Sequence, residues 1–323
     1  MNRFLSMLTV CCLLAMAGCG ASHHSNHADS SSHASVFGGE YPMKVVCTTG
    51  QVAEMIVRIG GTHVHVDNLM GPGVDPHLYR PLPSDVHKLD AADAIFYNGM
   101  HLEGRMADLF VQMARRKATF AVTEGLQTRK DPRLREPPEF EGMYDPHVWH
   151  DVALWSDCVR DMAEALVQFD PTHADDYEKN AATYIAELEE LDVFCRSEIA
   201  KIPKDRRVLV TAHDAFGYFG TAYGLEVHGL KGISTEEEIS VKHQEELQAM
   251  IIERKIPAVF VESAVSYRTV QALIEPCRAA GHDLQQGGEL YADALGPAGT
   301  PDSTYTGMIR HNVRTIVEAL SVE

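Results

Sequence analysis

The sequence is poor in basic residues, and beyond its N-terminal segment it has no long apolar run. Lysine and arginine together number 28, against 46 aspartates and glutamates, so the formal net charge is −18. Such a surface would repel nucleic-acid phosphates, and we expect no nucleic-acid partner. The negative charge is only weak evidence for a cation ligand, because many soluble proteins are acidic for solubility alone. The lack of a later apolar run excludes a membrane-spanning helix in the body of the chain.

Two common metal and redox motifs are also missing. There is no His-Glu-x-x-His, the helix motif of many metallohydrolases, and no Cys-x-x-Cys. Of the 7 cysteines, those that remain after the N-terminal segment are widely spaced: Cys47, Cys158, Cys195 and Cys277. They allow three pairings, and the sequence selects none of them. We interpret them as small core residues.

The first residues predict export. Arg3 precedes an apolar run from Leu5 to Met16, which is too short to span a bilayer and is typical of a signal peptide. Met16-Ala17-Gly18-Cys19 resembles a bacterial lipobox, so we expect a signal peptide over 1–18 and a lipid on Cys19. The alternative is an ordinary secretory signal with an incidental cysteine. Residues 19–40 are rich in histidine and serine and predict a flexible tether, which would leave the protein lipid-anchored on the outer or periplasmic side of the membrane.

Strand and helix patterns alternate from residue 41 onward, which is typical of parallel α/β sheets. The sequence predicts a first α/β lobe over 41–169, in which Ser84 caps a helix and 125–145 is a long polar loop. A linking helix over 170–203 follows, begun by Asp170-Pro171 and ended by Pro203, and a second α/β lobe occupies 204–323. Apolar residues recur at helical spacing along one face of the linking helix: Tyr177, Ala181, Tyr184, Leu188, Leu191 and Cys195. The predicted fold is therefore α/β, with two lobes that each contain a parallel sheet flanked by helices, joined by one long rigid helix.

Three of the 17 histidines stand out by their context. His77 and His147 each follow an Asp-Pro pair, and His213 ends a predicted strand. Proline stiffens the turn, and the preceding aspartate can orient the imidazole. All three lie at the ends of strands or helices, where open α/β sheets bind ligands. The other histidines of the body show no such pattern and are interpreted as surface or core residues, whereas those in the tether gather metal only weakly.

With these motifs in view, the chain from about Met43 onward resembles the cluster A-I solute-binding proteins of metal-uptake ABC transporters. These are the zinc- and manganese-binding lipoproteins of the TroA, PsaA and ZnuA kind. The resemblance rests on Asp75-Pro76-His77-Leu78-Tyr79, Pro83-Ser84-Asp85, Asn98-Gly99-Met100-His101-Leu102-Glu103, Asp145-Pro146-His147-Val148-Trp149, Thr211-Ala212-His213-Asp214-Ala215-Phe216-Gly217-Tyr218-Phe219, Gly232-Ile233-Ser234-Thr235, Val261-Glu262-Ser263 and Leu290-Tyr291-Ala292-Asp293-Ala294-Leu295-Gly296.

The resemblance implies a fold in which two lobes and a rigid helix hold one metal at the lobe interface. It implies four metal ligands: His77, His147, His213 and Asp293. Three imidazoles and one carboxylate suit Zn²⁺ and can also hold Mn²⁺. Manganese-dedicated relatives often have glutamate in place of His213, which favours zinc slightly. Against zinc, residues 125–145 lack the histidine-rich loop that zinc-specific relatives often have.

His150 departs from the family pattern, because that position is usually apolar. It follows His147 by three residues at a helix start and is an alternative ligand. We prefer His147, because Asp145-Pro146 precedes it.

The predicted function is capture of one divalent metal, Zn²⁺ or Mn²⁺, and its delivery to an ABC-transporter permease by a monomeric, non-enzymatic receptor. A site closed by four protein ligands favours carriage, because catalysis needs an open coordination position. Binding needs neutral histidines, so affinity should fall around or below pH 6. The alternatives are a secreted zinc metallohydrolase, for which Glu262 is the candidate base, and a metal-binding adhesin, which has no sequence signature here.

Overall fold

The computed structural model describes residues 36–140, 142–237 and 239–321, all within one compact unit. The predicted signal peptide, Cys19 and the tether up to residue 35 lie outside the described residues. Within the described part, no helix combines the length and the apolar character that crossing a membrane requires.

The first lobe is built on a parallel four-stranded sheet with the order β2-β1-β3-β4. Its strands are β1 (Met43–Cys47), β2 (Val64–Asn68), β3 (Ala94–Tyr97) and β4 (Ala118–Ala121). The helices of this lobe are α1 (Gly50–Gly60), α2 (Pro83–Ala91), α3 (Ala107–Ala114) and α4 (Glu124–Thr128). Val45 of the central strand pairs with Val66 on one side and with Ala94 on the other. The sheet therefore presents its strand ends, and the loops that follow them, at one edge.

The second lobe contains two parallel strand pairs. One pair is β5 (Val208–His213) with β6 (Glu226–Lys231), and the other is β7 (Ala258–Glu262) with β8 (Gln285–Leu290). Helices α7 (Gly217–Tyr223), α8 (Val241–Arg254), α9 (Tyr267–Ala279) and α10 (Tyr305–Ser321) complete it. β5 and β7 lie against each other without forming a ladder, so the single sheet we predicted is divided in two.

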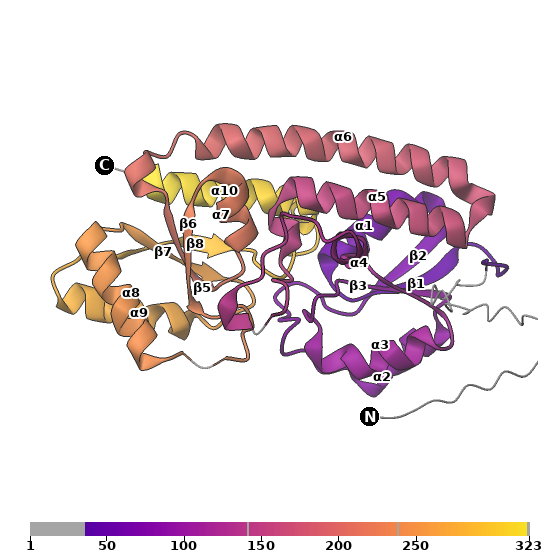
Figure 1. The fold of residues 1–323 in the computed structure, drawn as a ribbon, viewed down its shortest axis with the longest axis horizontal. Helices are drawn as coiled ribbons and strands as arrows, with labels where there is room; N and C mark the ends of the chain where they lie inside the picture. The colour runs from indigo at the N-terminus through magenta and orange to yellow at the C-terminus, as the bar shows by residue number, and fades with distance from the viewer. Residues whose placement is uncertain (1–35, 141, 238, 322–323) are drawn as a thin grey trace, which may run out of the picture. The chain divides into compact units, whose positions relative to one another are not determined.

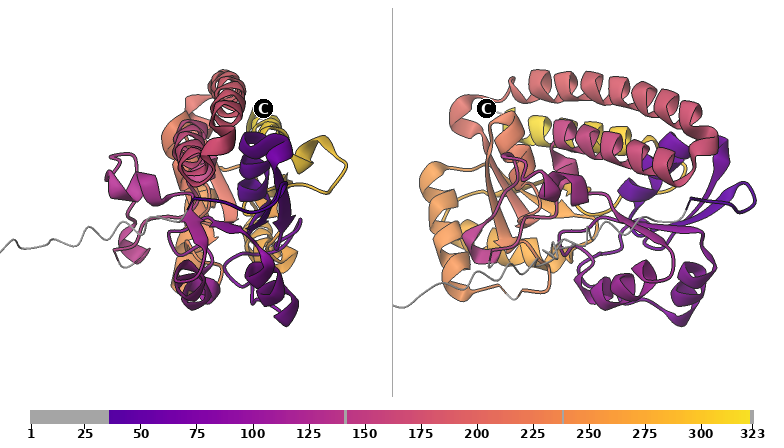
Figure 2. Two further views of the ribbon diagram at one scale, coloured as in Figure 1. Left: turned by 90° about the vertical axis from the view of Figure 1, so that its right-hand side faces the viewer. Right: turned by 45° about the vertical axis from the view of Figure 1, so that its right-hand side comes forward.

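One long helix, α6 (Ala174–Ile199), joins the lobes, and α5 (Val152–Phe169) of the first lobe packs against it. In Figure 1, α6 runs above both groups of strands, with α5 and α10 beneath it. It packs against α5 and α1 and also against α10, so it contacts elements from both lobes. The predicted apolar face of α6 is confirmed, because every residue named for it is buried. Figure 2 shows the same helix pair from two further sides. The predicted two-lobed α/β fold with one long helix is thus confirmed.

Asp170 caps the chain before α6, as the sequence predicted. Its carboxylate accepts a hydrogen bond from the backbone N–H of Thr172 at 3.2 Å, and Pro171 occupies the first position of a 3-10 turn over Pro171–His173. The α-helix itself begins only at Ala174.

Two local predictions were wrong. Ser84 is not a cap, because α2 already begins at Pro83, and the Asp85 carboxylate accepts a hydrogen bond from the Leu82 N–H instead. The polar segment 125–145 is not a continuous loop, since it contains most of the short helix α4 and a 3-10 turn over Pro138–Phe140. Both elements are too short for their periodicity to show in the sequence.

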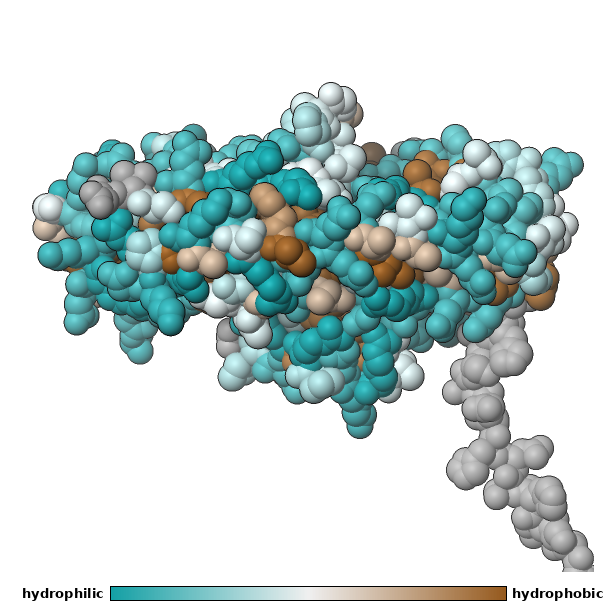
Figure 3. All heavy atoms as spheres, turned by 90° about the horizontal axis from the view of Figure 1, so that it is seen from above, coloured by the Kyte–Doolittle hydropathy of each residue, from teal (hydrophilic) through white to brown (hydrophobic). Residues whose placement is uncertain are grey.

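The four cysteines of the body are free and buried, which confirms their interpretation as core residues: Cys47, Cys158, Cys195 and Cys277. On the face seen in Figure 3 the surface is mostly hydrophilic, with hydrophobic side chains scattered among polar ones. Such scattered side chains are normal for a soluble surface and need no partner to explain them.

Candidate metal centre

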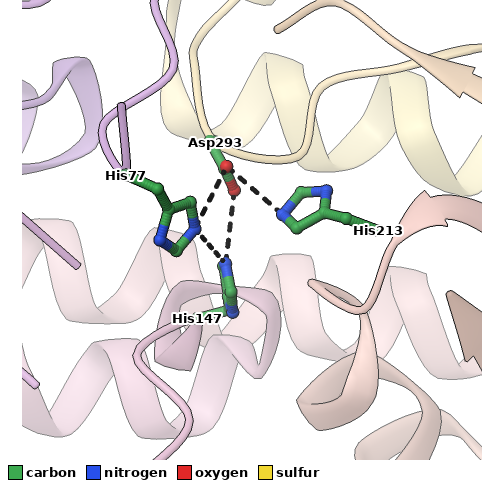
Figure 4. A group of neighbouring side chains, drawn as sticks. All are labelled: His77, His147, His213 and Asp293. Carbon is green, nitrogen blue, oxygen red and sulfur yellow. Dashed lines mark hydrogen bonds and ion pairs between the residues drawn. The ribbon is translucent and has the colours of Figure 1, made fainter. Parts of the chain in front are cut away.

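The structure brings four side chains from distant parts of the chain to one buried point (Figure 4). His77 follows β2, and His147 precedes the 3-10 turn over Val148–His150. His213 is the last residue of β5, and Asp293 follows β8. His77 lies within the loop between β2 and α2, and the parallel topology directs such loops after strands to the same edge of a sheet. The first lobe thus supplies two of these side chains and the second lobe the other two.

The distances between these side chains match the size of a metal coordination sphere. The Nε2 atoms of His77 and His147 are 3.2 Å apart, and Asp293 Oδ2 lies 3.3 Å from Nε2 of His213 and 3.6 Å from Nε2 of His77. Asp293 Oδ1 lies 3.5 Å from Nε2 of His147. Four tetrahedral donors at about 2.0–2.1 Å from Zn²⁺ would be about 3.3 Å apart. One ion fits between them without large movements.

Three polar atoms at this point also lack hydrogen-bond partners. Both carboxylate oxygens of Asp293 and Nε2 of His213 are buried and make no hydrogen bond within the described structure. A buried carboxylate that accepts no hydrogen bond is costly, and a cation bound among the four side chains would remove that cost. The donor set therefore suits a divalent metal.

Carboxylates behind two of the histidines set their tautomers. Asp145 Oδ1 lies 2.8 Å from Nδ1 of His147 and also accepts a hydrogen bond from the backbone N–H of His147 at 3.0 Å. Because a carboxylate only accepts, Nδ1 carries the hydrogen and Nε2 offers its lone pair to the site. Glu262 does the same for His213, accepting from its Nδ1 and, at 3.0 Å, from its backbone N–H. Glu262 is therefore engaged as a support for His213, which argues against its use as the base of a hydrolase.

The first Asp-Pro-His turn is held differently from the second. Asp75 Oδ1 accepts from the backbone N–H of His77 at 2.9 Å, so it fixes the turn and not the ring. Asp75 Oδ2 accepts from the hydroxyl of Thr235 at 2.6 Å, and Thr235 belongs to the second lobe. This hydrogen bond links the two lobes beside the site.

His150 lies next to the site but faces another group. Its Nε2 lies 3.1 Å from the carbonyl oxygen of Ala292, and Trp149 Nε1 donates to the same oxygen at 2.9 Å. Since a carbonyl only accepts, the Nε2 of His150 carries hydrogen and has no lone pair for a metal. The structure therefore places His147 with the other three side chains. The rings of Trp149 and His150 instead hold the backbone next to Asp293 through the carbonyl of Ala292.

Burial and neighbouring charges shift the pKa values of His77 and His213 in opposite directions. Burial lowers the pKa of His77 to about 3, and Asp293 only partly opposes this. Burial would also lower the pKa of His213, but the carboxylates of Glu262 and Asp293 outweigh it and raise that pKa well above its ordinary value. Burial alone would raise the pKa of Asp293, yet His213 and the other two imidazoles hold it below its usual range. The two shifts favour a charged His213 beside a charged Asp293, whose Oδ2 lies 3.3 Å from Nε2 of His213.

Several supporting residues were not identified from the sequence. Asn98 Nδ2 donates to the carbonyl of Pro146 at 3.1 Å, and Glu103 accepts from the backbone N–H of Asn98 at 2.7 Å. This pair explains why the Asn98 to Glu103 motif accompanies the second Asp-Pro-His turn. Arg135 donates from Nη1 to Asp145 Oδ2 at 3.0 Å. Nothing in the sequence singled out Arg135, because its partner is recognisable only in three dimensions.

Comparison with known proteins shows the family to which the chain belongs. A family model described as "Zinc-uptake complex component A periplasmic" matches residues 45–319. The chain is 41% identical over 321 residues to the manganese-binding lipoprotein MntA of Bacillus subtilis, covering 99% of this chain and 100% of that protein. It is 44% identical over 277 residues to the zinc-binding protein TroA of Treponema pallidum, covering 86% of this chain and 88% of TroA.

Solved structures with a similar fold come from the same group of proteins. The periplasmic zinc-binding protein TroA from Treponema pallidum matches with a TM-score of 0.82, at 44% identity, over 88% of this chain and 100% of the TroA chain. The Fe(III)-bound YtgA from Chlamydia trachomatis matches with a TM-score of 0.78, at 26% identity, over 87% and 100% of the two chains. This chain belongs to the family of the zinc-uptake complex component A proteins, the metal receptors of ABC transporters.

Proposed function

We propose that this protein captures one divalent transition metal between its lobes and delivers it to the permease of an ABC importer. The observation that carries the proposal is the convergence of His77, His147, His213 and Asp293 on one buried point. The metal is cargo, bound by neutral imidazole nitrogens and a carboxylate. The protein acts as a receptor and catalyses no reaction.

The donor set favours zinc slightly over manganese. Three nitrogens and one carboxylate are a common zinc environment, whereas manganese prefers more oxygen ligands. Asp293 directs Oδ1 toward His147 and Oδ2 toward His213, so both oxygens face the site. Two carboxylate oxygens would give a fifth donor, which also accommodates Mn²⁺. The relatives named for manganese, zinc and Fe(III) are consistent with a site that admits more than one ion.

The lobes would act as functional units bounded by the helical segment 170–203. Residues 41–169 supply His77 and His147, and residues 204–323 supply His213 and Asp293. Small movements of one lobe against the other would separate the two pairs of ligands. Such movements would open the site for release at the permease.

Lipid on Cys19 would anchor a monomeric receptor on the outer or periplasmic side of the membrane. Relatives named as lipoproteins support this, and so does the Met16-Ala17-Gly18-Cys19 motif. Cys19→Ser should move the protein from the membrane fraction to the soluble fraction of the envelope. Continued membrane association of that variant would contradict the anchor.

Elemental analysis tests the central proposal. Protein purified without added metal should hold close to one equivalent, and competition between Zn²⁺ and Mn²⁺ should show preference for zinc. His213→Ala should abolish tight binding, since it removes one ligand and the partner of Asp293. His87→Ala is the matched control, because His87 is an exposed histidine of α2. Retention of full affinity when each of the four ligands is replaced in turn would overturn the proposal.

A further inference from the structure

We propose that Arg135 is a positioning residue that ties the ligand His147 to the contact between the two lobes. The inference rests on the proposed metal-binding function and adds a route by which lobe separation would weaken the site. Arg135 does not reach the metal. It acts through Asp145, the carboxylate behind His147.

The first part of the route lies within the first lobe. Arg135 Nη1 donates to Asp145 Oδ2 at 3.0 Å, while Asp145 Oδ1 receives the Nδ1 hydrogen of His147 at 2.8 Å. The Asp145 N–H also donates to the carbonyl of Arg135 at 2.9 Å. Asp145 and His147 are fully buried, so the arginine supplies positive charge to a carboxylate that has no access to water. Loss of that partner would leave the carboxylate under-supported and the imidazole less firmly oriented.

The second part of the route crosses to helix α7 of the second lobe. The guanidinium carbon of Arg135 lies 5.8 Å from the ring centroid of Tyr218. The backbone N–H of Arg135 donates to the Tyr218 hydroxyl at 3.1 Å, and that hydroxyl donates to the carbonyl of Asp145 at 3.0 Å. Arg135 and Asp145 of the first lobe therefore both contact Tyr218 of the second lobe.

Gly217 provides the space for this contact. A Cβ atom at Gly217 would overlap the guanidinium of Arg135, and the three atoms nearest to it all belong to that guanidinium. Gly217 does not have a positive φ, so alanine suits its backbone. A methyl group at Gly217 would therefore displace the guanidinium of Arg135.

His147 and His213 each have a supporting carboxylate, but only the support of His147 depends on contact between the two lobes. His213 is held by Glu262, and both belong to the second lobe. The support of His147 depends on Arg135, whose side chain is held between Asp145 and α7. Separation of the lobes would remove Tyr218 from Arg135 and loosen His147 while His213 stays oriented. The first lobe would then release the metal before the second.

The test is the rate at which Zn²⁺ leaves the loaded protein, measured by stopped-flow mixing with an excess of a chromogenic chelator. Arg135→Ala should accelerate dissociation by roughly 10-fold, the lower end of the 10- to 100-fold loss typical of outer-shell changes at metal sites. Gly217→Ala should produce an acceleration of similar size. The double variant should be no faster than Arg135→Ala, because the added methyl has no guanidinium left to displace. Arg135→Lys should recover part of the wild-type rate by keeping the charge beside Asp145.

The controls separate positioning from folding. Gly104→Ala adds a methyl where no atom lies within 4 Å, and Arg160→Ala removes an exposed arginine of α5 that pairs with Asp157. Both should keep the wild-type rate, and the metal-free melting temperature of Gly217→Ala should match that of the wild type.

Two outcomes would overturn the inference. One is an unchanged dissociation rate in Arg135→Ala, and the other is a full Gly217→Ala effect in the double variant. Failure of the wild-type protein to bind one Zn²⁺ would instead refute the proposed function, so the two failures are distinguishable.

Discussion

Glu262 supports His213 at two points, accepting one hydrogen bond from its backbone N–H at 3.0 Å and another from its ring Nδ1. This carboxylate and Asp293 together raise the pKa of His213 although burial opposes the shift. In the metal-free protein the protonated form of the ring is therefore favoured. The metal has to displace the Nε2 proton of His213 before it can bind there.

Metal affinity should accordingly depend on pH through the titration of His213. Because its pKa is raised, the proton competes with the metal below that pKa, and affinity should fall about tenfold for each pH unit of acidification. Burial lowers the pKa of His77 to about 3, so His77 stays neutral near pH 7 and does not contribute to the pH dependence of metal affinity there. Calorimetry in buffers of different ionisation enthalpy should detect about one proton released per metal at pH 7. Glu262→Gln should reduce that release, and a wild-type release of zero would refute the assignment.

The hydrogen bond from Thr235 to Asp75 should contribute to metal affinity. It spans 2.6 Å between the lobes, and Thr235→Val removes it without changing the side-chain volume. The half-buried Asp75 would lose a donor, and the turn that carries His77 would loosen. We expect affinity to fall by roughly tenfold, which corresponds to a hydrogen bond to a charged group worth about 1.5 kcal/mol.

Competition with a chelator of known affinity measures this effect. Thr183→Val is the matched control, because the exposed Thr183 hydroxyl bonds only to the helix carbonyl of Lys179 among the hydrogen bonds of the described residues. Equal affinities for wild type and Thr235→Val would show that the link between the lobes does not support the site.

Asp170 should make stability depend on pH. Its carboxylate accepts hydrogen bonds from Tyr41 and Tyr177, each at 2.7 Å, and from His173 at 2.9 Å. Burial would raise its pKa, but these donors hold the pKa below its usual value. The charged form is thus favoured in the folded state, so its contribution is present above the unfolded pKa of about 4 and is lost as pH falls through the lower folded pKa.

Asp170→Asn should therefore cost about 1–3 kcal/mol in urea unfolding at pH 7, and the difference from wild type should shrink below pH 4. Asp205→Asn, at an exposed position, should be neutral at both pH values. A difference that stays constant from pH 7 to pH 3 would show that the charge of Asp170 is not the stabilising feature.

The buried face of α6 should dominate the stability of the linking helix. Leu188 is fully buried there, and Leu188→Ala should destabilise the protein by about 2–5 kcal/mol because it leaves a cavity. Val193 on the same helix is 67% exposed, and Val193→Ala should change stability by less than about 0.5 kcal/mol. Urea unfolding of the metal-free proteins measures both. Similar costs for the two substitutions would contradict the packing of α6.

Much of the fold could be predicted from local patterns. The period of Tyr177, Tyr184 and Leu188 predicted the buried face of α6, because helical spacing repeats over many turns. The division of the second lobe into two strand pairs could not be predicted, since nothing local distinguishes strands that form a ladder from strands that only pack. Short elements such as α4 were missed for lack of periodicity.

The amino-acid sequence by itself determined the alternation of strands and helices, the long linking helix and the stiff Asp-Pro-His turns, because each depends on residues close together in the chain. Only the tertiary structure decided which donors meet. Asp293 lies beside His77 although more than half of the chain separates them, and Glu262 reaches His213 from another strand. Thr235 and Arg135 gained their roles only when the lobes came together. Contacts of this kind depend on the packing of whole elements, which no short segment encodes.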